Sequence, residues 1–459
     1  MFTSKSALSV SDAIGLAYAS FNRAKPYFTP GADRDIRHPE WTGRLLHRLG
    51  RPDQDGYNVA VTGSKGKGSH AILLAAILEK FGFRTGLFTG PHLVDFMERF
   101  RINGKSIDGA RFVDYIQRVH AESEHFTVPR HQYIGPVGLL AAVASLWFRD
   151  ERTDVNVYEL GRGALHDDVN QIVHRGAVMA PVFLEHVNEL GPTLADVAHE
   201  KCGIIANTSW ITSAAQSNTV FNLLRKRCEE ENARLRLIGR NFTYTNTVGI
   251  DGSYVSVEIQ SGEELCTLHL PPGSSAMTAT NAVVAFDAAR QVLSDLRPGV
   301  LPPREIDLGL LLLPGRMQVV RQQPLTLLDG TIHAQSAAYV RQWASDLKVK
   351  GNARKIGMIV GIPADKSGTG VLQELSSVVD WVIVTRAHNP YLHFDGGVAV
   401  AARNYFPAVW ETDSIEEALG LAQSAMTQDD ALCIVGTQSV VGDTLKVLGC
   451  PTRSIWRQN

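Results

Sequence analysis

A short run of glycines, lysines and serines has the residue types that bind phosphate. It comprises Gly63-Ser-Lys-Gly-Lys-Gly-Ser69 and directly follows the apolar stretch Val59–Thr62. Glycines let backbone N–H groups turn toward an anion, and a helix that begins there adds partial positive charge. Lys67 can reach the terminal phosphates, and Ser69 can bind Mg²⁺. The run predicts a phosphate loop, although Gly68 separates Lys67 from Ser69, and a plain glycine-rich turn is the alternative.

The elements that must carry this loop alternate between strands and helices. The stretch Val59–Thr62 predicts a buried strand, and Ala71–Phe81 predicts the helix that follows the loop. Thr193–Ile205 has helical periodicity, with Thr193 able to cap it. Further buried strands are expected at Leu87–Thr89, Val155–Tyr158 and Ala177–Leu184. This alternation predicts an α/β fold with a mostly parallel sheet that helices cover on both faces.

The second half of the chain indicates an antiparallel excursion and then a second domain. Residues Asn241–Leu270 alternate polar and apolar side chains around Asp251-Gly252, and a helix is expected at Ala279–Leu293. Arg297-Pro298-Gly299 suits a linker. After it we expect strands at Thr326–Leu328, Ile356–Val360, Val382–Thr385 and Leu432–Val435, and helices at Ala337–Leu347 and Ile415–Ala425. We therefore predict an ATP-binding domain over residues 1–297 and a smaller C-terminal α/β, Rossmann-like domain over residues 298–459.

The bulk composition excludes several classes of protein. The 459 residues have a formal charge of -2, so no concentrated basic surface indicates a nucleic-acid partner. No apolar run has the length of a membrane span, and Met1–Ala13 lacks the apolar core of a signal peptide. The five cysteines form no CxxC pair. A reduced cytoplasmic protein, without membrane association or a disulfide framework, is expected, as a monomer or a small homo-oligomer.

Several further motifs follow the phosphate loop in order along the chain. They are Gly90-Pro-His-Leu93, Glu98-Arg-Phe-Arg-Ile-Asn-Gly104, Glu159 to Asn170 (ELGRGALHDDVN), Glu185-His186 with Leu190 to Thr193, Glu200-Lys-Cys-Gly-Ile204, Leu313-Pro-Gly-Arg316 and Leu328-Asp-Gly-Thr-Ile-His333. In these blocks the chain resembles the Mur ligase superfamily, and within it folylpolyglutamate synthase and dihydrofolate synthase.

The resemblance implies an ATP-dependent ligase that phosphorylates a carboxylate and joins it to an amine, with ATP and Mg²⁺ as cofactors. By default the acid is a folate and the amine is glutamate. Clustered positive charge is needed because the phosphate, the carboxylate and the transition state are all anionic.

The same resemblance assigns roles to individual residues. The implied catalytic residues are Lys67, His186, Lys201 and Arg316. The implied metal ligands are Ser69, Glu159, His186 and Lys201, the lysine as a carbamate. The implied nucleotide contacts are Gly63, Ser64, Lys65, Gly66, Lys67, Gly68, Ser69, Asn281, Arg316 and Asp329, and the acyl-substrate contacts are Asp167, Asn170 and His333. Because the linker separates Lys67 from Arg316, domain closure is expected to assemble the site.

The chain departs from the family pattern at positions that select metal and substrate. Gly90 replaces a serine that is often a metal ligand, and Ala164-Leu165 replace a glycine and an arginine. Thr331-Ile-His333 stand where the family has AHN, and no acid follows Tyr133. We therefore keep open a ligase for a non-folate acid in a specialised pathway, a degenerate nucleotide-binding protein without turnover, and a P-loop kinase.

Overall fold

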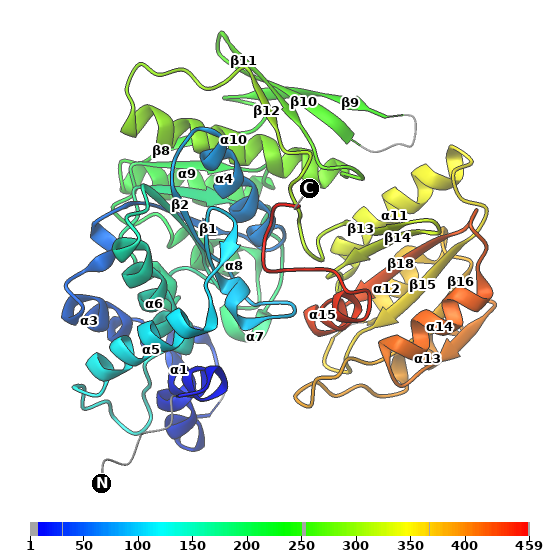
Figure 1. Cartoon of the computed structure of the whole chain (residues 1–459), viewed down its shortest axis with the longest axis horizontal. Coiled ribbons are helices and arrows are strands. Elements are labelled where there is room, and N and C mark those ends of the chain that lie inside the picture. The colour runs from blue at the N-terminus through cyan, green and yellow to red at the C-terminus, as the bar shows by residue number, and fades with distance from the viewer. Residues whose placement is uncertain (1–7, 30, 250–253, 367, 458–459) are drawn as a thin grey trace.

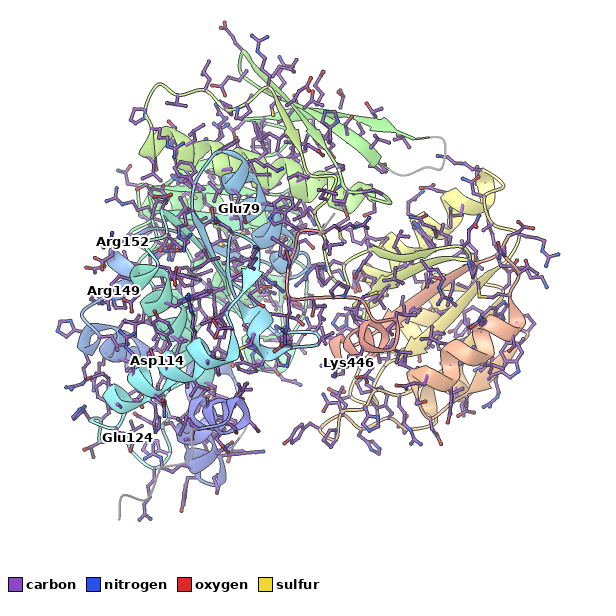
Figure 2. The ribbon with its side chains drawn as sticks, in the orientation of Figure 1. Glu79, Asp114, Glu124, Arg149, Arg152 and Lys446 are labelled. Atoms are coloured by element: carbon purple, nitrogen blue, oxygen red, sulfur yellow. The ribbon has the colours of Figure 1, made fainter. Side chains whose placement is uncertain are left out.

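The computed structural model describes residues 8–29, 31–249, 254–366 and 368–457. Two α/β units lie side by side, and the chain ends between them (Figure 1). The larger unit has an eight-stranded sheet and a separate four-stranded sheet, and the smaller unit has a six-stranded sheet. Exposed charged side chains such as Asp114 and Glu124 lie on the outside of the larger unit (Figure 2).

The strand that enters the phosphate loop lies in the middle of the large sheet. The strand order is β4-β3-β2-β5-β1-β6-β7-β8. The bounds are β1 Tyr57–Thr62, β2 Thr85–Phe88, β3 Phe100–Ile102, β4 Lys105–Ser106, β5 Val155–Glu159, β6 Gly176–Met179, β7 Trp210–Ser213 and β8 Arg234–Leu237. All neighbours are parallel except β2 with β3 and β3 with β4. The predicted mostly parallel sheet is confirmed.

Helices cover both faces of this sheet, which explains why β1 is apolar throughout. Val59 and Val61 belong to the core that includes α4 (Lys67–Lys80) and α10 (Ala276–Leu296). Ala60 belongs to the opposite core. That core is formed with α1 (Val10–Ala24), α3 (Glu40–Arg48), α5 (Gly109–Ser123), α6 (Pro136–Asp150), α8 (Leu194–Cys202) and α9 (Asn218–Glu230). Alternate side chains of a strand face opposite layers, so both faces need apolar residues.

The antiparallel excursion is confirmed. It comprises β9 (Thr243–Val248), β10 (Tyr254–Ser261) and β11 (Glu264–His269), and β12 (Glu305–Asp307) adds in parallel to β11. Its apolar side chains, such as Val257 and Leu268, pack into the core shared with α10. The predicted Asp251-Gly252 turn lies outside the described residues.

The smaller unit is a second parallel sheet between helices. Its strand order is β13-β14-β18-β15-β16-β17, and only the β13–β14 pair is antiparallel. The strands are β13 Gln318–Gln322, β14 Leu325–Asp329, β15 Ile356–Gly361, β16 Trp381–Val384, β17 Val409–Glu411 and β18 Ala431–Gly436. The helices are α11 Ala334–Val349, α12 Gly368–Leu375, α13 Gly397–Ala402, α14 Ile415–Ala425 and α15 Gln438–Val447. The predicted elements of this region are present.

Two chain segments connect the units. Leu308 and Leu311, which follow β12, are buried in the core of the larger unit. The C-terminal segment returns to that unit, where Leu312 N–H donates to Ile455 O at 2.6 Å. The predicted division into domains at residues 297 and 298 stays a prediction. In the structure, β12 and the segment after it pack with the larger unit.

Two predicted elements have different bounds in the structure. The strand predicted over Ala177–Leu184 ends at Met179, because the chain then turns to support the phosphate loop: Pro181 O accepts the Ser64 N–H at 2.9 Å. The helix after the loop begins at Lys67 rather than Ala71. In the described part of the chain, no helix combines the length and apolar character needed to cross a membrane.

Candidate active site

The phosphate loop is held between β1 and α4. Gly66 caps α4 with φ 89°, a left-handed conformation that favours glycine. Gly63 passes so close to the β6 strand end that a Cβ there would lie 2.6 Å from the Ala180 Cβ. The Lys67 ammonium donates to Gly63 O at 2.9 Å, within the loop itself. The loop therefore presents the start of α4, with Lys67 folded over it, to the carboxyl edge of the sheet.

Glu159 ends β5 next to this loop, as predicted. Its Cα pairs with Val61 in the sheet register, and its Oε2 accepts the Gly90 N–H at 3.1 Å. Burial raises the pKa of Glu159, against the lowering effects of Arg316 and Lys67. A buried carboxylate that faces two cations is a suitable ligand for a metal ion or a neighbour for bound phosphate.

Lys201 lies on the other side of Lys67 and is fully buried. Its ammonium is 2.9 Å from Glu185 Oε1 and donates to Gly63 O at 3.0 Å and to Arg162 O at 2.6 Å. Burial and then the charge of Lys67 lower the pKa of Lys201 to about 8, although Glu185 opposes this. The pKa of Glu185 is lowered by Lys201 and Lys67 despite the opposing effect of its burial. These charges form one buried cluster behind the phosphate loop.

His186 is placed differently from the prediction. It does not end a strand but lies in the loop after β6, with φ 50°, at the start of α7 (Val187–Leu190). Its ring nitrogens lie 3.8 Å from Glu185 Oε2 and 3.9 Å from Glu189 Oε2. Burial lowers its pKa against these two carboxylates. The imidazole thus borders the Lys201–Glu185 pair.

Two of the four predicted metal ligands offer oxygen donors. Over the described ranges, no three His, Cys, Asp or Glu side chains gather as a metal cluster. Glu159, at the end of β5, and the buried Ser69, in the first turn of α4, nevertheless provide a carboxylate and a hydroxyl, oxygen donors of the kind that Mg²⁺ prefers. These two fit one magnesium ion that shares its coordination with phosphate. His186 and Lys201 as ligands stay a prediction.

The smaller unit contributes Arg316 to the phosphate loop. A Cβ placed on Gly68 would lie 2.1 Å from Arg316 Nη2, so the guanidinium rests against the first turn of α4. Its Nη1 donates to Pro314 O at 3.2 Å. Gly68, the residue that interrupts the usual Lys-Ser order, therefore makes room for Arg316.

Two further predicted nucleotide contacts, Asp329 and Asn281, and one predicted substrate contact, His333, border the same loop. Asp329 ends β14 and lies 3.2 Å from Lys65 Nζ. Asn281 is buried on α10, and its Nδ2, which has no partner in the described structure, would lie 3.4 Å from a Cβ on Gly66. His333 caps α11, and its pKa is lowered by burial, with the charge of Glu185 opposing and those of Lys366 and Lys65 adding to the shift. The structure thus brings all of these residues to the interface of the units.

Asp167 and Asn170 lie farther along the larger unit. Asp167 accepts the Gly161 and Val169 N–H groups at 3.1 and 2.9 Å and pairs with Arg37 at 3.5 Å. Asn170 Nδ2 donates to Gly203 O at 3.0 Å, while its buried Oδ1 has no described partner. The Asp167 carboxylate is thus occupied by two backbone N–H groups and Arg37, whereas Asn170 Oδ1 is available to accept a hydrogen bond.

Sequence reasoning assigned no role to several residues of this region. Glu185 has no predicted role, yet it is the partner of Lys201; its place directly before His186 is the available signal. Arg162 pairs with Asp33 at 2.6 Å and with Glu189 at 3.2 Å. Asp33 lies far away in sequence, so no local pattern could identify this pair.

Two departures from the family pattern have visible consequences. A Cβ built on Gly90 would meet only Arg99 Nη1, at 3.4 Å. The space that a serine side chain would occupy here is therefore open. Leu165 is 41% exposed, and its backbone packs against Gly203. An exposed leucine where the family has an arginine makes this part of the surface less basic and more apolar.

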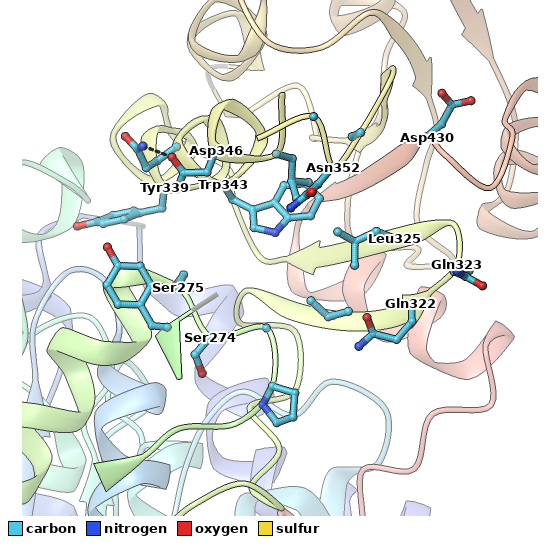
Figure 3. Close-up of a pocket in the computed structure, with 18 of the residues that line it drawn as sticks. Ser274, Ser275, Gln322, Gln323, Leu325, Tyr339, Trp343, Asp346, Asn352 and Asp430 are labelled. Carbon is cyan, nitrogen blue, oxygen red and sulfur yellow. Dashed lines mark hydrogen bonds between the residues drawn. The ribbon is translucent and has the colours of Figure 1, made fainter. Parts of the chain in front are cut away.

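A large cavity lies elsewhere. Its volume is about 920 Å³, and its walls include Tyr254, Tyr339 and Trp343 (Figure 3). Gln323 and Asn352 line it at the amino ends of β14 and β15. Ligands of parallel α/β sheets bind at the opposite, carboxyl ends. The phosphate loop, Asp329 and His333 all lie at carboxyl ends, so this cavity is separate from the candidate active site.

Comparisons with known proteins concern the whole chain and its fold. The chain matches no family model. Folylpolyglutamate synthase of Lacticaseibacillus casei is 28% identical over 355 residues, which cover 74% of this chain and 78% of that protein. The probable bifunctional folylpolyglutamate synthase/dihydropteroate synthase of Haloferax volcanii is 28% identical over 419 residues and 87% of this chain, but this chain spans only about half of that protein, 47%.

A solved structure shows the same fold. Folylpolyglutamate synthase of Mycobacterium tuberculosis, in crystals with ADP and AMPPCP, superposes with a TM-score of 0.80 over 91% of this chain and 97% of that chain, at 23% identity. The chain is therefore similar in sequence to folylpolyglutamate and dihydrofolate synthases, and it has the α/β fold of the solved folylpolyglutamate synthase.

Proposed function

We propose that this chain is an ATP-dependent, ADP-forming ligase that activates a carboxylic acid as an acyl phosphate and joins it to the amine of an amino acid. The observation that carries the proposal is the position of Lys67. Its charge acts on the buried Glu159 on one side and on the Lys201–Glu185 pair on the other. One cation thus lies between a candidate metal site and a candidate transfer site.

Both units contribute residues to nucleotide binding. The start of α4 offers backbone N–H groups to the phosphates, and Lys67 can move from Gly63 O to the terminal phosphate. Arg316 adds a second cation from the smaller unit. Mg²⁺, held by Ser69 and Glu159, would neutralise phosphate charge and polarise the transferred group. His186 and Lys201 are the proposed further ligands.

Phosphoryl transfer and amide formation require the acid, the terminal phosphate and the amine in one site from which water is excluded. Lys67 and Arg316 would stabilise the charge that develops as the acid oxygen attacks the phosphorus and ADP leaves. The amine then attacks the acyl carbon, the carbon–oxygen bond breaks, and phosphate leaves. Asn170 Oδ1 and His333 are the proposed contacts of the organic substrates. Asn170 bonds Gly203, two residues after Lys201, and the charge of Glu185, the partner of Lys201, acts on His333.

The relatives make a folate and glutamate the first substrates to test. The curated names above describe folylpolyglutamate synthases, and these names supply the default acid and amine. The exposed Leu165 favours the second candidate, a ligase for a less anionic, non-folate acid. A degenerate binding protein is disfavoured because Lys67, Glu159, Lys201 and Arg316 share one site. The proposal places the enzyme in the cytoplasm, as a monomer or small homo-oligomer.

The test is ADP release with Mg-ATP, glutamate and either dihydropteroate or a reduced folate. Turnover that needs both acid and amine supports the ligase and identifies a folate enzyme. Silence with folates but turnover with another acid and amine from a panel keeps the chemistry and favours the second candidate. ADP release that needs no amine indicates a kinase, and nucleotide binding without any turnover indicates a degenerate protein.

A further inference from the structure

The phosphate loop of this chain carries a second lysine that contacts the other unit. Lys65 occupies the position between Ser64 and Gly66, and its side chain is 21% exposed. Its Nζ lies 3.2 Å from Oδ1 of Asp329, which ends β14 in the smaller unit. The two residues are 264 positions apart in the chain. This ion pair therefore ties the loop that binds phosphate to the opposite unit.

Asp329 is fixed independently of Lys65. Its Oδ2 accepts the Met317 N–H at 2.8 Å, and its Oδ1 accepts the Thr331 hydroxyl at 2.5 Å. Met317 has φ 49° and directly follows Arg316. Asp329 thus holds the turn that presents Arg316, and the Gly330 N–H bond to Gly315 O at 3.1 Å supports the same turn. The carboxylate is 2% exposed, so its charge is well sheltered from solvent.

Two of the contacts between the units share one short segment. Lys65 reaches Asp329, and Arg316 rests against Gly68, three residues after Lys65. Since Asp329 also shapes the Arg316 turn, the lysine and the arginine are connected through one carboxylate. A displacement of the smaller unit that breaks the Lys65 pair also withdraws Arg316 from the loop.

We infer that Lys65 and Asp329 are a positioning pair, which holds the smaller unit over the phosphate loop so that Arg316 is in place when nucleotide binds. The inference deepens the proposed function, since it assigns the pair to the binding of a nucleoside di- or triphosphate. A partly buried pair of opposite charges suits this role better than an exposed one, because solvent screens it less. Lys65 acts through Arg316 and is not itself required to touch the reacting atoms.

Three variants separate this role from a general loss of stability. Lys65→Asn removes the charge but keeps a polar side chain in the loop. Lys65→Arg retains the charge and serves as the conservative control. Asp329→Asn removes the same pair from the other side and also weakens the Arg316 turn. The readouts are the dissociation constant for Mg-ADP by calorimetry and the radius of gyration by X-ray scattering, both at low and high salt.

We expect Lys65→Asn to bind ADP about fivefold more weakly than the wild type and Lys65→Arg to bind it with nearly wild-type affinity. Asp329→Asn should bind ADP more weakly than Lys65→Asn. The Lys65→Asn change should add little to Asp329→Asn in the double variant. Scattering should show a more open Lys65→Asn protein, and the wild type should open at high salt.

Unchanged ADP affinity and unchanged scattering in Lys65→Asn would overturn the inference, and so would tighter ADP binding, which would make the pair an inhibitory contact. If the wild type binds no ADP, the proposed function fails, while scattering of the free proteins still decides whether the pair holds the units together. If ADP binds and depends on Lys65 but no acid is ligated, the positioning pair stands without the ligase.

Discussion

The Lys201 ammonium lies 2.9 Å from the Glu185 carboxylate, behind the phosphate loop and beside Lys67. The ammonium also donates hydrogen bonds to the Gly63 and Arg162 carbonyl oxygens. An ammonium has three N–H donors and no acceptor, and three oxygens lie within 3.0 Å of this one. The carbamate implied by the family resemblance would need the Lys201 side chain to leave these oxygens, because a carbamate presents acceptors rather than donors.

Replacement of Lys201 by alanine should lower kcat/KM by about a hundredfold, because the residue links the loop to Glu185. If the lysine works as a carbamate, acetate should restore part of the activity, and ¹³C-bicarbonate should give a carbamate signal in the wild type. If Lys201→Ala is impaired, acetate does not rescue it and the wild type gives no ¹³C carbamate signal, Lys201 acts through its ion pair with Glu185. Full activity of Lys201→Ala would contradict both roles.

Replacement of Lys67 by alanine should abolish measurable ADP formation. The charge of this lysine acts on both Glu159 and Glu185, and the loss corresponds to at least about a hundredfold in kcat. Lys226→Ala on the surface of α9, where the side chain is 72% exposed, is the matched control. Coupled ADP release measures both, and turnover retained by Lys67→Ala would reject the loop as the nucleotide site.

Replacement of Gly68 by alanine should displace Arg316, because the new Cβ would lie 2.1 Å from the Arg316 Nη2 position. The arginine side chain can move, so the protein should fold, and the KM for ATP should rise by about tenfold, a loss of roughly 1.4 kcal/mol. Gly420→Ala in α14 has open space around its new Cβ and is the control. An unaltered KM for ATP in Gly68→Ala would mean that Arg316 does not contact the nucleotide.

Replacement of Gly90 by serine should improve metal binding. The site has room for a side chain, with only Arg99 Nη1 at 3.4 Å from the new Cβ, and Gly90 N–H already bonds Glu159. We expect a lower Mg²⁺ concentration for half-maximal turnover in Gly90→Ser and no such change in Gly90→Ala, because only serine adds an oxygen donor. Equal Mg²⁺ requirements in the two variants would exclude position 90 from the metal site.

Glu79 gives a prediction about pH and stability. This residue of α4 accepts the Trp456 Nε1–H at 2.9 Å, and burial raises its pKa to about 7, although Trp456 and Lys80 oppose the shift. Between its ordinary pKa and about 7, the folded protein binds a proton that the unfolded chain has released. The contribution of Glu79 to stability therefore falls as pH rises through this window.

Glu79→Gln keeps an acceptor for Trp456 and removes the buried charge. The variant should be more stable than the wild type at pH 8, by about 2 kcal/mol, with a smaller difference at pH 5. Thermal unfolding at the two pH values measures this. A variant that is equally destabilised at both would show that Glu79 is fully charged and well paired in the folded protein.

The parallel architecture could be predicted because its signals are local. The buried strand of β1, the glycine-rich turn and the helix of α4 follow one another directly, and Thr193 caps α8 with its side chain as expected. Strand ends were harder to predict, since the chain from Ala180 to Leu184 is as apolar as a strand. It leaves the sheet because Pro181 and Phe183 bond to Ser64, a tertiary contact with no local pattern.

The sequence predicts several residues that the structure brings together, but not the contacts between them. The motifs identify Lys67, Glu159, Lys201 and Arg316, yet nothing local indicates that Lys201 pairs with Glu185 or that Arg316 rests on Gly68. Such contacts depend on how two units pack together. Charges separated by hundreds of residues leave no periodicity, so the pairing needs the fold.

The central claim is that an acid is activated as an acyl phosphate. The most direct measurement uses the acid that supports ADP release, labelled with ¹⁸O in its carboxylate, and follows the label into phosphate by mass spectrometry. Attack of the carboxylate on ATP, followed by attack of the amine on the acyl carbon, transfers one ¹⁸O to each phosphate released. Phosphate that carries one ¹⁸O per turnover is the predicted result, and phosphate without the label, formed during amide synthesis, would contradict it.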